Sequence, residues 1–246
     1  FRSISTYMRM LRSIYNRGVD MHQAPYVHGL FRDVFTGVDT RQKKAIPIGE
    51  LHMLLNKDPQ SEKLRRTQAI ANLLFQFCGM PFSDLAHLEK SNLERGLLKY
   101  NRTKTGTPMS IEVLESAQNA IGGLYNKSDA RSSGYPDYLF RILSGAYKRN
   151  EEGAYREYQS ALRRFNNELK SLSRKLRLHS PVTSYTLRHS WATTAKYRGV
   201  PIEMISESLG HKSIKTTQIY LKGFELEERT KVNKLNYSYV CNFKML

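Results

Sequence analysis

The residues of this sequence that could perform chemistry are a tyrosine and several cationic side chains in a fixed order. Arg188 is followed directly by His189, and His211 shares the stretch LGHKSIKTTQIYLK with Tyr220. Cleavage of a phosphodiester needs a nucleophile, cations for the non-bridging oxygens and an acid for the leaving alkoxide. A phenol becomes an adequate nucleophile near neutral pH when surrounding cations stabilise its ionised form. Together these side chains favour phosphoryl transfer through a tyrosine, whereas any one of them alone would predict nothing.

A lysine precedes these residues on a predicted β-hairpin. Lys104 lies in GLLKYNRTKTGTPMSIEVL, where two short runs compatible with β-strands flank Lys104, Thr105 and Gly106. The pattern predicts that Lys104 sits on the turn of the hairpin. Arginine suits the phosphate-binding role because its planar fork donates two hydrogen bonds and stays protonated.

Short helices with clear end signals are expected to position the C-terminal motifs. Thr183 or Ser184 is placed to cap the helix of the arginine, and Gly199 to end it. A second helix opens with the proline and closes with the glycine of PIEMISESLG. Ser213 is the candidate N-cap of the helix that bears Tyr220. The motifs therefore lie on consecutive capped helices.

Helical periodicity dominates the rest of the chain. Apolar residues recur at helical spacing in residues 4–14, in a helix that Gly18 would end, and again in residues 61–79 and 155–176. The helix at 155–176 has a basic opposite face that consists of Arg156, Arg163, Lys170, Arg174 and the adjoining Arg177. That face either follows a phosphate backbone or is an ordinary solvated surface. The whole pattern predicts an α+β fold, predominantly α-helical, with a small antiparallel β-sheet.

The composition favours a polyanionic partner. The 246 residues carry a formal net charge of +17, and 40% of them are hydrophobic, as in ordinary globular proteins. Excess Lys and Arg favour polyanions because each neutralised phosphate releases counterions. Nucleic acid is the leading partner and an acidic membrane surface the second. No apolar run is long enough to span a membrane and no signal segment opens the chain, so a cytoplasmic location is expected.

The stretches YTLRHSWATTA and LGHKSIKTTQIYLK resemble the two signature boxes of the tyrosine recombinases, also called phage integrases. The resemblance covers residues 43–246 as the catalytic domain. Residues 1–18 resemble only the last helix of the family's core-binding domain, and residues 19–42 are the expected linker. Because the chain starts at Phe1 within a helical pattern, we expect that domain to be truncated. Integrases of conjugative transposons are the most similar branch, since SY..RHSWAT and GM.F.D.A.L are typical of them.

The resemblance implies a role for four residues. Tyr220 matches the nucleophile that attacks the scissile phosphate, forms a 3′-phosphotyrosyl bond and frees a 5′-hydroxyl. Arg188 matches the second family arginine, which binds the non-bridging oxygens, and His211 matches the residue that hydrogen-bonds the phosphate. Lys104 matches the hairpin lysine that protonates the leaving 5′-oxygen. The protein–DNA ester conserves the bond energy, so the implied reaction needs neither a cofactor nor a metal.

Two positions depart from the family pattern. In CGMPFSDLAHL, Pro81 stands where the first family arginine is expected, although Asp84 matches the family's acidic position. Tyr185 stands where histidine is more usual, and its hydroxyl can still hydrogen-bond the phosphate region. The loss of one phosphate-binding arginine would remove several kcal/mol of transition-state stabilisation. We therefore predict that another basic side chain replaces it, the candidates being Arg65, Arg66 and Arg102.

These matches imply a site-specific DNA recombinase or integrase that cleaves and rejoins strands. One alternative is a DNA-binding protein of the same fold with impaired catalysis, which Pro81 keeps open. The other is an enzyme similar to type IB topoisomerases or telomere resolvases, which the tight Leu-Gly-His to tyrosine spacing disfavours. The implied partners are duplex attachment sites, further copies in a synaptic homotetramer and a DNA-bending helper protein, with no membrane. The tail, apolar at Val240, Phe243 and Leu246, packs either on its own domain or on a neighbouring protomer.

Overall fold

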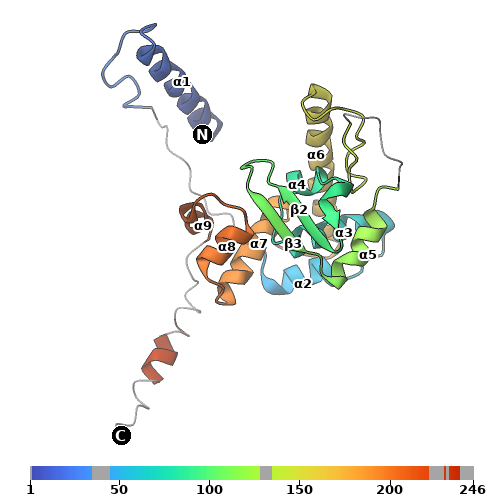
Figure 1. Ribbon diagram of the computed structural model, residues 1–246. Coiled ribbons are helices and arrows are strands. Elements are labelled where there is room, and N and C mark those ends of the chain that lie inside the picture. Colours follow the sequence, from blue (N-terminus) through green and yellow to red (C-terminus); the bar gives the residue numbers. More distant parts are fainter. Residues whose placement is uncertain (1, 35–44, 128–134, 222–229, 231–232, 239–246) are drawn as a thin grey trace. The chain divides into compact units, whose positions relative to one another are not determined.

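The computed structural model (Figure 1) describes residues 2–34, 45–127, 135–221, 230 and 233–238. Of Tyr220 it describes the backbone only. The chain forms two compact units, residues 1–42 and residues 43–246. The predicted apolar end of the tail, at Val240, Phe243 and Leu246, lies outside the described residues.

The first unit is built on one amphipathic helix, α1 (Arg2–Asp20). Gly18 does not end this helix, which continues to Asp20. The Tyr15 hydroxyl donates to the Pro25 carbonyl oxygen at 2.9 Å and accepts from the Val27 amide at 2.6 Å. These two bonds fold the segment after α1 back along the helix.

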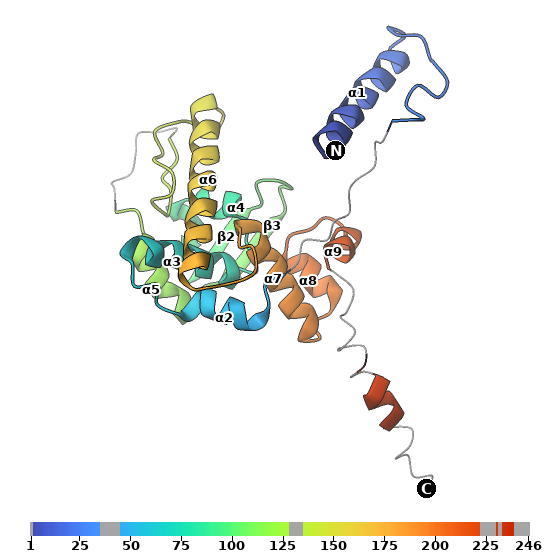
Figure 2. The ribbon, with the colours of Figure 1, turned by 180° about the vertical axis from the view of Figure 1, so that it is seen from behind.

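The second unit is organised around α3 (Glu62–Gln76), which packs against four other helices (Figure 2). They are α2 (Ile48–Asn56), α5 (Glu115–Leu124), α6 (Glu152–Lys175) and α7 (Ser184–Tyr197). Residues at the predicted apolar spacing of α3 are buried, among them Leu73 and Leu74. The helix ends before Gly79, because Cys78 and Gly79 have positive φ angles of 54° and 65°, outside the helical region.

The long helix α6 has the two faces that its sequence predicts. Phe165, Leu169 and Leu172 are buried in the large hydrophobic core. The basic residues of the opposite face are exposed, namely Arg156, Arg163, Lys170, Arg174 and the adjoining Arg177. The apolar face therefore fixes the helix on the core and leaves the cations accessible.

A small antiparallel sheet follows α4 (Phe82–Ala86) and the 3₁₀ turn η1 (Lys90–Asn92). Its order is β1–β2–β3, with β1 (Leu93–Glu94), β2 (Leu97–Asn101) and β3 (Pro108–Glu112). Leu98 pairs with Ile111, and both are buried, so this face of the sheet joins the core. The connection from β2 to β3 is the predicted hairpin, and Lys104 lies in its turn.

Three helices that lie side by side carry the C-terminal motifs (Figures 1 and 2). They are α7, α8 (Ile202–Ser208) and α9 (Ile214–Tyr220). Thr183 caps α7, since its hydroxyl oxygen accepts from the Thr186 amide at 3.2 Å. Gly199 follows the end of α7 with a positive φ of 76°, as a C-terminal glycine does. Ser213 occupies the N-cap position of α9, and among the described residues its side chain makes no capping bond.

Two hydrophobic clusters anchor these helices. The large core includes Leu187 of α7, and a smaller cluster consists of Ala192, Ile205 and Leu209. Because α7 contributes to both clusters, it holds the segment that begins at Leu209 against the main body of the unit. Within the described ranges, no helix is long and apolar enough to cross a bilayer.

Candidate active site

Arg188 of α7 is the centre of the candidate site. It is only 4% exposed, and its Nη1 donates to the Gly79 carbonyl oxygen at 2.9 Å. Its Nη2 donates to the Leu209 carbonyl oxygen at 2.5 Å and lies 3.2 Å from Nε2 of His211. The bonds to two separate backbone carbonyls fix the plane of the guanidinium, as a phosphate-binding arginine requires.

Gly79 permits the close approach of α7. A Cβ atom at this position would lie 3.2 Å from Cα of Arg188 and 3.1 Å from Cβ of Trp191. Its φ of 65° is also in the left-handed region. Only glycine meets both conditions without strain, so Gly79 holds its carbonyl against the guanidinium.

A second arginine, Arg102, reaches the same place from the end of β2. It is 7% exposed, and its Nη1 donates to the carbonyl oxygens of Leu209 at 2.6 Å and Gly210 at 3.2 Å. Its Nε donates to Oδ2 of Asp84 at 3.3 Å, and this carboxylate is 2% exposed. The buried ion pair offsets the charge of one arginine and fixes its orientation, so two guanidinium groups can converge on one carbonyl.

Gly210 makes room for Arg102. It has a φ of 63°, and a Cβ atom there would collide with Cδ of Arg102 and lie 2.7 Å from Sδ of Met109. The glycine of the Leu-Gly-His motif is therefore required both by its backbone conformation and by the arginine that crosses it.

His211 is neutral in this environment. Burial, followed by the charges of Arg188, Arg102 and Lys104, lowers the pKa of His211 from 6.5 to about 4. Its Nδ1 lies 2.8 Å from Oγ1 of Thr217. Thr217 was not identified from the sequence. The signal that could have indicated it is its position one helical turn before Tyr220.

The other predicted site residues lie around this cluster. Lys104 is exposed on the hairpin turn, close enough for its charge to lower the pKa of His211. Tyr220 is the last residue of α9, and its side chain lies outside what the structure describes. Tyr185 is 43% exposed and packs edge-on against His189, with ring centroids 4.6 Å apart.

Of the three predicted replacements for the missing arginine, Arg102 is the one whose hydrogen bonds lie within the site. Arg65 pairs with Asp58 at 3.0 Å on an exposed surface. Arg66 donates to the Arg141 carbonyl oxygen at 2.6 Å, also on an exposed surface. Pro81 itself is the N-cap residue of α4. Among these three candidates, Arg102 is thus the one that lies beside Arg188 and His211.

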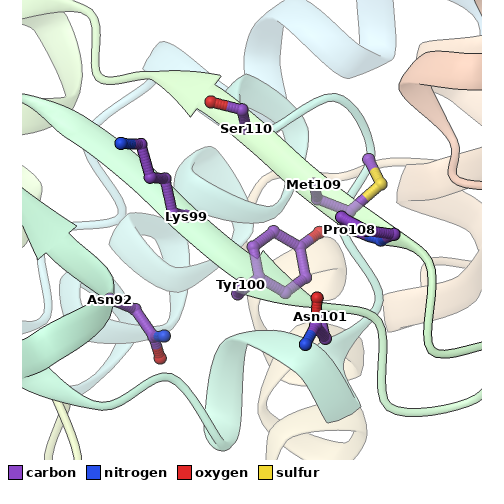
Figure 3. Close-up of a pocket in the computed structure, with 7 residues that line it drawn as sticks. All are labelled: Asn92, Lys99, Tyr100, Asn101, Pro108, Met109 and Ser110. Atoms are coloured by element: carbon purple, nitrogen blue, oxygen red, sulfur yellow. The ribbon is translucent and has the colours of Figure 1, made fainter.

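A separate pocket of about 440 Å³ lies on the sheet (Figure 3). It is lined by Asn92, Lys99, Tyr100, Asn101, Pro108, Met109 and Ser110. None of the arginine cluster lines it, and Lys99 pairs with Ser110 in the strand register beneath it.

No group of three His, Cys, Asp or Glu side chains within the described part of the chain is placed to hold a metal ion. Arg102, Arg188 and Lys104 can supply positive charge to a phosphodiester, and His211 can supply a hydrogen bond.

Comparison with known proteins identifies the family of the chain. A model of the phage integrase family matches residues 48–226, so the chain belongs to the phage integrase family and the predicted family is confirmed. A probable integrase/recombinase of Methanocaldococcus jannaschii is 28% identical over 204 residues, which cover 80% of this chain and 58% of that protein. Tyrosine recombinase XerD of Halalkalibacterium halodurans is 30% identical over 190 residues, which cover 73% of this chain and 57% of that protein. The chain thus spans under three fifths of either relative.

A solved structure supports the fold independently. The Tn1549 transposon integrase in complex with a circular intermediate DNA has a TM-score of 0.66 to this chain at 15% identity. The match covers 96% of this chain and 79% of that one. At such low identity the likeness establishes the fold alone. The predicted class, a mostly helical tyrosine-recombinase catalytic domain with a small antiparallel sheet, is confirmed.

Proposed function

We propose that this chain is a site-specific DNA recombinase or integrase that cleaves and rejoins strands through a 3′-phosphotyrosyl intermediate. The observation that carries the proposal is the convergence of Arg102 and Arg188 on the Leu209 carbonyl beside His211. Two buried guanidinium groups this close repel one another, and a phosphodiester anion between them relieves the repulsion. Family membership and the net charge of +17 support DNA as the source of that anion.

The proposed reaction needs only side chains of the protein. The Tyr220 hydroxyl loses its proton to solvent, and its oxygen bonds to the scissile phosphorus as the bond from phosphorus to the 5′-oxygen breaks. Arg102, Arg188 and His211 stabilise the charge on the non-bridging oxygens, and Lys104 gives a proton to the leaving 5′-oxygen. Attack by the 5′-hydroxyl of a second strand reverses these steps, so the ester energy is retained and strands can be exchanged.

Arg102 takes the role of the arginine that Pro81 displaces. The presence of Arg102 in this role argues against the alternative of a DNA-binding protein with impaired catalysis. The ion pair with Asp84 supports this assignment, because it holds Arg102 in the site in the absence of DNA. Tyr185 and Asp84 act as supporting residues, the first through its hydroxyl and the second through Arg102.

The proposal extends to partners and organisation. The Tn1549 integrase is described in complex with DNA, and we propose duplex attachment sites as the substrate of this chain. Residues 43–246 are the catalytic domain, residues 1–18 the last helix of a core-binding domain and residues 19–42 the linker. The active assembly is a synaptic homotetramer in the cytoplasm, with a DNA-bending helper protein.

A covalent capture experiment tests this function on a pool of DNA duplexes of randomised sequence. The chain is incubated with a pool of nicked duplexes of randomised sequence, in which cleavage near the nick releases a short fragment and traps the ester. DNA that stays bound after treatment with detergent is sequenced. We expect one enriched motif with the wild-type chain and no retained DNA with Tyr220→Phe. Equal retention by both proteins, or none with either, contradicts the proposal.

A further inference from the structure

The side chain of Thr217 on α9 is buried against His211. Thr217 is 0% exposed, and its Oγ1 lies 2.8 Å from Nδ1 of His211. It stands one helical turn before Tyr220 on the same helix. We infer that Thr217 is a positioning residue for the proposed cleavage, whose hydroxyl turns His211 so that Nε2 faces Arg188 and the phosphate site. The effect on cleavage rests on the proposed function, whereas the orientation of the ring does not.

The partners of the two ring nitrogens define the tautomer. Nη2 of Arg188 lies 3.2 Å from Nε2, and a guanidinium group can only donate. Nε2 therefore accepts and carries no proton, which places the proton on Nδ1. Nδ1 donates that proton to Oγ1 of Thr217, so the hydroxyl holds the ring in the orientation in which Arg188 selects this tautomer.

Phosphate binding requires Nε2 to donate a hydrogen bond, whereas in the free chain it accepts one. A phosphate oxygen accepts hydrogen bonds, so Nε2 must then carry a proton. The ring can gain a second proton and keep donating from Nδ1, or it can change tautomer and accept at Nδ1. A hydroxyl both donates and accepts, so Thr217 remains bonded to the ring in either case. Valine, which has the same shape, could do neither.

The charged groups around the His211 ring make its protonation depend on whether a phosphodiester is bound. Arg188 from α7, Arg102 from the end of β2 and Lys104 from the hairpin all disfavour protonation of His211. A bound phosphodiester offsets their charge and favours the protonated ring. The bond to Thr217 also ties the ring to α9, so His211 and the helix of Tyr220 move together.

Three variants isolate this role. Thr217→Val removes the hydroxyl and keeps the volume, and Thr217→Ser keeps the hydroxyl. Thr216→Val makes the same change at the exposed neighbour. Long-range ¹H–¹⁵N NMR of the free chain reads the tautomer of His211, with the signals assigned through His211→Gln. We expect the Nδ1–H form in wild type, Thr217→Ser and Thr216→Val, and a mixture of tautomers in Thr217→Val, whose ring is no longer held facing Arg188.

Trapping on nicked DNA across a range of pH supplies the second measurement. We expect Thr217→Val to form the covalent adduct about tenfold more slowly, the effect of one net hydrogen bond, with an altered pH profile. Thr217→Ser should restore the rate and the profile. The inference is overturned if Thr217→Val matches Thr216→Val in tautomer, rate and profile. A wild-type chain with the Nδ1–H form but no adduct contradicts instead the proposed function, while the orientation of the ring by Thr217 stands.

Discussion

Arg102 and Arg188 donate to the same backbone oxygen, the carbonyl of Leu209, at 2.6 Å and 2.5 Å. The two side chains come from the hairpin and from α7, which are distant in sequence. Leu209 belongs to the small hydrophobic cluster, so the shared acceptor is fixed by packing. Two cations are thus pre-organised at one point, as the proposed stabilisation of a phosphodiester transition state requires.

Arg102→Lys should slow DNA cleavage by about 10²–10³-fold, because lysine keeps the charge but cannot reproduce the planar fork. Rates of adduct formation on a trapped nicked duplex measure the effect. DNA affinity should change little, since the charge is retained. Arg66→Lys, at an exposed arginine bonded outside the site, is the matched control and should keep the wild-type rate. A wild-type rate for Arg102→Lys would remove Arg102 from the catalytic set.

Gly210→Ala and Gly199→Ala form a second matched pair. Both glycines have positive φ, 63° and 76°, so each alanine should lower the unfolding free energy by roughly 1–2 kcal/mol. A Cβ atom at Gly199 meets nothing within 4 Å, whereas at Gly210 it collides with Arg102. We expect Gly199→Ala to keep its cleavage rate and Gly210→Ala to lose it. Chemical denaturation and adduct formation give the two readouts, and equal rates in the pair would argue against the placement of Arg102.

His211 should make folding stability depend on pH. Its pKa is depressed in the folded chain to about 4 from an ordinary 6.5, so the unfolded chain binds more protons between these values. Its stabilising contribution is therefore fully present above about pH 6.5 and is lost as the pH falls toward 4. Denaturant titrations of wild type and His211→Gln measure the difference. The gap in unfolding free energy between the two proteins should narrow with falling pH, and a constant gap would contradict a neutral, half-buried imidazole.

The basic face of α6 should contribute to duplex affinity. Lys170→Gln and Arg174→Gln remove exposed cations, and each lost phosphate contact should reduce the slope of log affinity against log salt by about 0.9. Arg156→Gln is the control on the same helix, because Arg156 is already paired with Glu152 at 2.6 Å. Fluorescence anisotropy at several salt concentrations gives the slopes. If all three variants keep the wild-type slope, the face is an ordinary solvated surface.

Local signals in the sequence were sufficient to predict several elements. The capping threonine and terminal glycine of α7 specify its ends within one segment, and the turn residues around Lys104 specify the hairpin. The predicted end of α3 lies too far along the chain, because Cys78 and Gly79 have positive φ angles and Gly79 packs closely against α7. Local patterns do not encode such contacts between distant segments.

The composition of the site was harder to predict for the same reason. Arg102 could not be distinguished from Arg65 or Arg66, since the choice depends on how β2 places its end beside Leu209. Thr217 was missed because its importance lies in a bond across the turn between α8 and α9. The motifs identify the residue types of the chemistry, and tertiary packing decides which further side chains join them.

The proposed reaction attaches Tyr220 covalently to DNA. Trapped adducts are digested with nuclease and trypsin, and the peptide TTQIYLK, residues 216–222, is sequenced by mass spectrometry. We expect a nucleotide on Tyr220 in wild type, the unmodified peptide in Arg188→Ala, and no DNA-linked peptide in Tyr220→Phe. A nucleotide on any other residue, or an adduct that persists in Tyr220→Phe, would contradict it.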